Sequence, residues 1–202
     1  MKRDVVIIGS CGSNLASLGF ALTRLGVDAP VTEDPARVRR ATHVILPGVG
    51  AAAAGMTRLA AAGLAEVVPT LTQPVLGICL GMQLLFAGSE EDDAKCLGVI
   101  DARVRRLPQS TDLPVPQMGW NQLENVTESP LLVDVAPGSF AYFIHSYAAP
   151  IDGFTRAVTR YGVPFSAVIE HRNFFGTQFH PERSAQVGAQ VLAYFLKIYI
   201  RY

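Results

Sequence analysis

Charged residues and cysteines are both scarce in this 202-residue sequence. Only 17% of the residues are charged, and 17 Lys and Arg balance 17 Asp and Glu. This balance argues against the excess of positive charge that marks a nucleic-acid-binding protein. Half of the residues are hydrophobic, which predicts one compact domain over residues 1–202 with a substantial core. We expect solvated surface positions for the Arg clusters at 37–40 and 103–106.

The sequence also lacks long hydrophobic runs. No stretch of about 18 consecutive apolar residues occurs, so no membrane span is expected. The apolar run at 5–8 is too short for the core of a signal peptide. Three cysteines without metal-ligand spacing predict reduced thiols, no metal site and a cytoplasmic location.

Buried strands and amphipathic helices alternate in the first half of the sequence. Strands are expected at 5–9, 29–32, 43–46 and 75–78, and helices at 14–25, 51–62 and 79–86. This order predicts an α/β fold with an open, mostly parallel twisted sheet flanked by helices. Additional antiparallel strands are expected in the C-terminal half, at 99–107, 140–146, 155–161, 166–170 and 174–179. A last helix should follow Ser184 as its cap.

The segment Gly77-Ile78-Cys79-Leu80-Gly81 joins a predicted strand to a predicted helix. It has the pattern of a nucleophile elbow, with cysteine in place of serine. Such a tight turn exposes the nucleophile, and flanking glycines remove the Cβ clashes that the turn would cause. The following helix N-terminus favours the thiolate. Cys79 is therefore the predicted nucleophile, although a buried cysteine between packing glycines would leave the same pattern.

A cysteine nucleophile needs a base, and His180 is the best candidate among four histidines. His180 follows a predicted strand, and Glu182 stands two residues later, on the same side of an extended segment. That carboxylate would orient the imidazole, which completes a triad.

The turn Pro47-Gly48-Val49-Gly50 lies between a strand and a helix. Its glycines would let the N–H groups at Val49 and Gly50 face a developing oxyanion, with the N–H of Leu80 as a further donor. Two other cysteines are weaker candidates. The loop that holds Cys11 does not fit the dinucleotide-binding pattern, and Cys96 follows an acidic stretch that would disfavour its thiolate.

These motifs together resemble the class I (triad) glutamine amidotransferases. The likeness rests on Leu76-Gly77-Ile78-Cys79-Leu80-Gly81-Met82-Gln83, on His180-Pro181-Glu182 and on the turn 47–50. The segments Met118-Gly119-Trp120-Asn121 and Tyr142-Phe143-Ile144-His145-Ser146-Tyr147 resemble, within that class, the glutaminase subunits of imidazole glycerol phosphate synthase. The resemblance covers essentially the whole chain.

The resemblance implies a glutaminase that hydrolyses L-glutamine through a thioester and passes ammonia to a (β/α)8-barrel cyclase subunit, as a heterodimer without metal or organic cofactor. The cyclase would form imidazole glycerol phosphate and an aminoimidazole carboxamide ribotide in histidine biosynthesis. By the same resemblance, glutamine would be bound by a set of pocket residues: Gly48, Gln83, Glu91, His145 and Ser146. The partner interface would include a second set: Asn14, Met118, Trp120 and Asn121.

Two positions depart from the resemblance. Gln117 stands where such proteins usually have His, so this position either tunes the interface or has no effect, and the loop 10–13 is one residue longer than usual. Three alternatives stay open: the amidotransferase subunit of another pathway, a stand-alone cysteine hydrolase, and a non-enzymatic thiol sensor or binding module.

Overall fold

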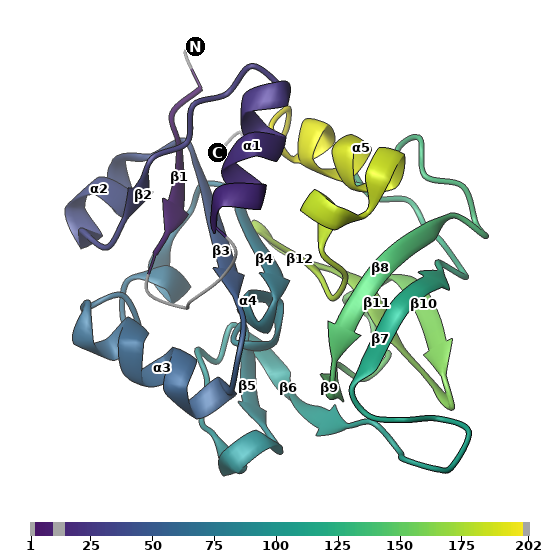
Figure 1. The fold of residues 1–202 in the computed structure, drawn as a ribbon. Coiled ribbons are helices and arrows are strands. Elements are labelled where there is room, and N and C mark those ends of the chain that lie inside the picture. The colour runs from purple at the N-terminus through teal and green to yellow at the C-terminus, as the bar shows by residue number, and fades with distance from the viewer. Residues whose placement is uncertain (1–2, 10–14, 200–202) are drawn as a thin grey trace.

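The computed structural model describes residues 3–9 and 15–199, and Figure 1 shows their arrangement. Within these residues a seven-stranded sheet has the order β10–β11–β12–β4–β3–β1–β2. Its strands are β1 (Val5–Ile8), β2 (Val31–Thr32), β3 (His43–Gly48), β4 (Val75–Cys79), β10 (Thr155–Tyr161), β11 (Val163–His171) and β12 (Phe174–Thr177). The five strands from β12 to β2 pair in parallel, and β10 and β11 add antiparallel pairs at one edge. The predicted fold class is confirmed.

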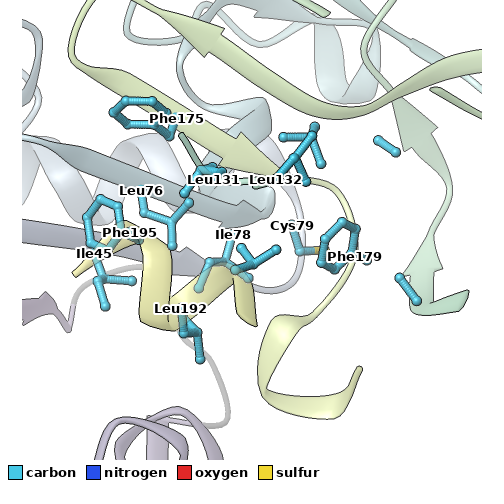
Figure 2. Packing of buried hydrophobic residues seen from close by; sticks show 14 of the residues in the cluster. Ile45, Leu76, Ile78, Cys79, Leu131, Leu132, Phe175, Phe179, Leu192 and Phe195 are labelled. Atoms are coloured by element: carbon cyan, nitrogen blue, oxygen red, sulfur yellow. The ribbon is translucent and has the colours of Figure 1, made fainter. Parts of the chain in front are cut away.

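Helices cover both faces of this sheet, so every position of its central strands β1, β3 and β4 is buried. Val5 and Ile7 of β1 pack into one cluster with residues of α1 and α5, whereas Val6 and Ile8 pack into another with α2 and α3. The helices are α1 (Leu15–Arg24), α2 (Pro35–Arg40), α3 (Ala52–Ala61), α4 (Leu80–Gln83) and α5 (Ala185–Phe195). Figure 2 shows the first cluster, in which Ile45, Leu76 and Ile78 of the sheet meet Leu192 and Phe195 of α5.

Residues 86–148 add two small sheets beside the central one (Figure 1). A ribbon of β7 (Gln117–Gln122) and β8 (Phe140–His145) is antiparallel, with Trp120 opposite Tyr142. The other sheet has the order β5–β6–β9, formed by β5 (Phe86–Ser89), β6 (Ile100–Arg106) and β9 (Tyr147–Ala148). Three short 3-10 turns complete the elements: η1 (Val68–Thr70), η2 (Glu91–Asp93) and η3 (Pro181–Arg183).

The predicted helix at 79–86 is wrong in its length. Only α4, a single turn, is helical, and Phe86 already begins β5. The carbonyl groups of Leu84 and Leu85 accept hydrogen bonds from the backbone at residues 97, 99 and 100 instead of continuing a helix. Pairing with a distant segment therefore overrides the local helical pattern.

Three other elements differ from the sequence predictions. Strand β3 continues through Pro47 and Gly48, because beyond Ile45 it pairs only with β4 and a proline there interrupts no second ladder. Helix α2 was not predicted, although Asp34 caps it by accepting a hydrogen bond from Ala36 N (2.9 Å). Strand β7 was not predicted either, because its sequence shows no alternating row of buried apolar residues.

Ser184 occupies the N-cap position of α5, but its side chain does not cap the helix. Its hydroxyl instead donates to the carbonyl of His180 (2.7 Å) and accepts from the N–H of Tyr142 (2.9 Å). Ser184 thus joins the segment after β12 to strand β8. Along the described ranges, no helix is long and apolar enough to cross a membrane.

Two glycines in helices provide a matched test of packing. A Cβ on Gly188 of α5 would lie 1.8 Å from the carbonyl oxygen of Pro181, whereas a Cβ on Gly19 of α1 would meet nothing within 4 Å. We predict that Gly188→Ala lowers the free energy of unfolding by about 2–3 kcal/mol, because backbone must move to admit the methyl group. Gly19→Ala should raise it by about 1 kcal/mol. Urea denaturation checks both values, and equal stability of the two variants would contradict the packing described here.

Candidate active site

Cys79 lies at the junction of β4 and α4, in an unusual backbone conformation. Its φ is 53° and its ψ is −112°, although cysteine has a Cβ that disfavours positive φ. Such a conformation costs about 1–3 kcal/mol and typically marks functional sites. The strand and the one-turn helix meet at this residue, as the elbow pattern predicted.

The two elbow glycines are required by close backbone contacts. A Cβ on Gly77 would lie 2.7 Å from Met82 N, and a Cβ on Gly81 would lie 1.7 Å from the carbonyl oxygen of Leu46. Any larger residue at either position would push α4 away from β3 and β4. The glycines therefore set the direction in which the chain leaves Cys79.

His180 and Glu182 form a buried pair next to the elbow. The Nδ1 atom of His180 lies 2.9 Å from Oε1 of Glu182, and their side chains are only 9% and 6% exposed. The predicted reason for this contact was wrong, because Glu182 belongs to the turn η3 rather than to an extended segment. That turn brings the carboxylate back to the imidazole.

The electrostatic environment of His180 favours its protonated form. Burial opposes the charged ring, but the Cys79 sulfur and the Glu182 carboxylate outweigh burial and raise the pKa of His180 to about 10. Nε2 of His180 has no hydrogen-bond partner of normal geometry among the described residues. Nε2 therefore stays available for another proton acceptor or donor.

The sulfur of Cys79 has two polar neighbours besides the histidine. As a thiol it donates to the carbonyl of Ile144 (3.6 Å), and it accepts from the side-chain amide of Gln178 (3.8 Å). Cys79 itself is 6% exposed and packs beside Phe179, as Figure 2 shows. Sequence reasoning assigned no role to Gln178.

A pocket of about 430 Å³ opens on the sulfur. Four of the five residues predicted to bind glutamine line it, namely Gln83, Glu91, His145 and Ser146, together with the predicted oxyanion residues Val49, Gly50 and Leu80. Gly48 instead lines a smaller cavity of about 150 Å³, which His180 and Glu182 also border. The pocket size suits a small polar molecule.

Three of the pocket side chains are held by internal hydrogen bonds. Nε2 of Gln83 donates to the carbonyl of Tyr147 (2.7 Å), and Oε2 of Glu91 accepts from Ala52 N (2.8 Å). Burial raises the pKa of Glu91. Nδ1 of His145 lies 2.8 Å from the carbonyl of Tyr147, so the neutral ring carries its proton there and presents a bare Nε2.

The turn 47–50 lies beside the elbow, as predicted. Gly48 pairs with Cys79 at the ends of β3 and β4, and Gly50 has a φ of 90°, a value that glycine adopts readily. Leu80 is the first residue of α4, where a backbone N–H has no partner within the helix. The three predicted oxyanion residues thus line the same pocket as Cys79.

The predicted interface residues take different positions. Met118 and Trp120 are 63% and 52% exposed, and Trp120 packs edge-on against Tyr142 (5.9 Å between ring centroids). Asn121 is engaged within the chain, since its side chain donates to the carbonyl of Arg160 (2.9 Å). Asn14 and the loop 10–13 lie outside the described residues.

Gln117, the unusual residue, is not on the surface. It is 3% exposed and lies opposite His145 in the β7–β8 ribbon. Cys96 is also buried, and burial raises its thiol pKa to about 11. The expected direction for Cys96 is confirmed, but its main cause is burial and not the acidic stretch. The described residues contain no cluster of three metal-ligating side chains.

The sheet, the elbow cysteine and the paired His and Glu together define a class I glutamine amidotransferase. The family model described as "Glutamine amidotransferase class-I" matches residues 7–198, and the chain belongs to that family of enzymes. Two solved glutamine amidotransferase structures, one of them from Thermotoga maritima, superpose with TM-scores of 0.73 and 0.67. They cover 96% of this chain each, with 97% and 83% of their own chains matched, at 19% and 18% identity, so they support the fold alone.

Curated relatives narrow the family. Imidazole glycerol phosphate synthase subunit HisH from Shewanella oneidensis is 48% identical, with 96% of each chain covered. The protein of the same name from Idiomarina loihiensis is 49% identical, over 96% of this chain and 98% of its own. Within its class, the chain therefore belongs to the HisH family of imidazole glycerol phosphate synthase subunits.

The buried neutral His145 makes stability depend on pH. Burial lowers the pKa of His145 to about 4, so the unfolded chain binds a proton below pH 6.5 that the folded chain refuses until about pH 4. We predict that the wild type loses about 3 kcal/mol more unfolding free energy between pH 7 and pH 4 than His145→Gln does. Urea denaturation across this range measures the difference. His171→Gln, at a more exposed site, is the control, and parallel curves for wild type and His145→Gln would refute the prediction.

Proposed function

We propose that Cys79, His180 and Glu182 are the catalytic triad of a glutaminase, contained in one domain over residues 1–202. The observation that carries this proposal is the buried His180–Glu182 pair in a pocket that Cys79 also lines. Cys79 and Glu182 raise the pKa of His180, which favours an imidazolium there. An imidazolium beside sulfur stabilises the thiolate, which is the reactive form.

The reaction follows from these positions. The Cys79 thiolate attacks the side-chain carboxamide carbon of glutamine, and His180 gives its proton to the departing ammonia. The thioester that forms is then attacked by water, from which neutral His180 takes a proton. Collapse of the second intermediate breaks the carbon–sulfur bond and restores the thiolate and the imidazolium. The γ-carboxylic acid that leaves gives its proton to water and becomes glutamate. Glu182 holds the ring in one orientation and stabilises its charge.

The oxyanion and the substrate would be held by groups that border the same pocket. The N–H of Leu80 and the Val49–Gly50 turn would stabilise the negative oxygen of both intermediates. A carboxylate at Glu91 suits the α-ammonium group of an amino acid, and Gln83, His145 and Ser146 offer neutral polar groups. Gly48 supports this arrangement from the end of β3 and borders the smaller cavity.

The ammonia would pass to the nucleotide substrate of a (β/α)8-barrel cyclase subunit that forms a heterodimer with this chain in the cytoplasm. The relatives bear the name of synthase subunits, which supports a complex. Met118 and Trp120 expose apolar surface on β7, and Trp120 contacts Tyr142, over whose ring Arg183 lies (4.7 Å). Trp, Tyr and Arg side chains are enriched at protein interfaces, and here Tyr142 is half-buried between exposed Trp120 and Arg183. Asn121 would keep this strand in place, and Asn14 is proposed from resemblance alone.

Replacement of Cys79 tests whether this chain produces the ammonia while the cyclase subunit uses it. We predict that Cys79→Ala lowers glutamine-dependent synthesis by the complex at least about 1,000-fold, because no thioester forms. Ammonia-dependent synthesis by the cyclase should be unchanged. Cys96→Ala is the matched control, since Cys96 is a buried thiol outside the pocket, and it should keep glutamine-dependent activity. Loss of both reactions in Cys79→Ala would contradict the proposal.

Glutamate release by the chain alone and in the complex tests the partner. We predict negligible glutamate release by the chain alone and a large increase with a cyclase subunit and its nucleotide ligand. The reason is that ammonia released without the partner would not be used in synthesis. Rapid hydrolysis that the cyclase leaves unchanged would indicate a stand-alone amidase. No hydrolysis under any condition would indicate a thiol sensor or binding module.

A further inference from the structure

A chain of side-chain amides leads from strand β9 to the nucleophile. Nε2 of Gln83 donates to both the carbonyl of Tyr147 (2.7 Å) and Oε1 of Gln178 (2.9 Å). Nε2 of Gln178 in turn donates to the sulfur of Cys79 (3.8 Å). Gln83 is 4% exposed and Gln178 is fully buried. Each amide therefore depends on its neighbours for hydrogen bonds.

The donor-to-acceptor direction of this series of amides is fixed by the carbonyl of Tyr147. A backbone carbonyl can only accept, so Tyr147 requires the NH2 group of Gln83. That NH2 group can only donate, so Gln178 must turn its oxygen toward Gln83 and its own NH2 group toward the sulfur. The carbonyl oxygen of Gln83 is then the only polar side-chain atom that it can offer to a molecule in the pocket.

The sulfur experiences opposite effects from its two polar neighbours. The carbonyl of Ile144 accepts from the thiol, and it becomes a repulsive partner when the proton leaves. The amide of Gln178 donates, and a hydrogen bond to an ionised acceptor is stronger than one to a neutral acceptor. Gln178 thus favours the thiolate where Ile144 favours the thiol.

We propose that Gln178 is a positioning residue of this active site, which holds the Cys79 thiolate by a donated hydrogen bond and fixes the pocket-facing orientation of Gln83. The proposal extends the proposed glutaminase function, and its statement about Gln83 rests on that function. The effect on the thiolate can be measured without glutamine and without the cyclase.

The test compares Gln178→Met with Thr177→Val in the full chain. Methionine fills a similar volume without a donor or an acceptor. Thr177, the neighbouring residue, is also fully buried, and its hydroxyl donates to the carbonyl of Phe179 (3.0 Å) rather than to the sulfur. Valine has nearly the shape of threonine, so this control removes one buried hydrogen bond and leaves the contacts of the sulfur intact.

The first readout is the rate of alkylation of Cys79 by iodoacetamide as a function of pH, followed on the Cys79 peptide by mass spectrometry. We expect the midpoint of the profile to move up by about one pH unit in Gln178→Met, the low end of the range for a hydrogen bond to a charged group. Thr177→Val should keep the wild-type midpoint. An unchanged midpoint in Gln178→Met would overturn the proposal, even if the variant is less stable.

The second readout is glutaminase activity in the complex with the cyclase subunit. Gln178→Met should lower kcat about 10-fold through the thiolate and raise KM for glutamine several-fold through a misplaced Gln83. A KM for glutamine equal to that of the wild type would overturn the proposed role of Gln178 in orienting Gln83. If the wild-type complex has no glutaminase activity while the alkylation midpoint still moves, the proposed function fails and the role of Gln178 at the sulfur stands.

Gln178→Leu serves where Gln178→Met does not fold. Leucine is also apolar and offers neither a donor to the sulfur nor an acceptor to Gln83. The alkylation midpoint should again move up by about one pH unit. A midpoint equal to that of the wild type would again overturn the proposal.

Discussion

Helix α4 rests directly on the end of β3, with no side chain between the two backbones. Leu46 O would lie 1.7 Å from a Cβ at Gly81, so only glycine permits this approach. Because α4 lies so close, the chain must turn sharply at Cys79 and accept a positive φ there. The turn holds the sulfur at the pocket and places the N–H of Leu80 beside it. The other groups of the site act on the sulfur, so their function depends on where they lie relative to this turn.

The His–Glu pair is held by a different set of contacts. Ser184 bonds both His180 and Tyr142, and the N–H of His180 donates to the carbonyl of Tyr142 (3.0 Å). These bonds tie the segment after β12 to strand β8. Burial itself lowers the pKa of His180, but it also strengthens the interactions with Cys79 and Glu182, which together raise that pKa.

Much of the fold and site could be predicted because the decisive patterns are local. Unbroken apolar runs indicated the parallel strands, and the glycines around Cys79 indicated the elbow. The end of α4 could not be predicted, because Leu84 and Leu85 bond to a segment more than ten residues away. The role of Gln178 was missed for the same reason: its partners, Gln83 and Cys79, are about a hundred residues distant in the sequence. Amides carry no sequence signal until tertiary contacts determine their neighbours.

Tyr142 connects the exposed surface of the ribbon to the triad. Its ring meets Trp120 on one side and the guanidinium of Arg183 on another, and its backbone holds both His180 and Ser184. Arg183 directly follows Glu182 in the turn η3. A partner seated on Trp120 would therefore contact the group of residues that fixes the His–Glu pair. By contrast, the amide chain through Gln83 and Gln178 approaches the sulfur from β9, on separate hydrogen bonds. The two sets of bonds nevertheless meet, because Gln178 stands two residues before His180 in the same segment and the carbonyl of Ile144 in β8 accepts from the Cys79 thiol. A displacement at the ribbon would therefore act on both the nucleophile and its base.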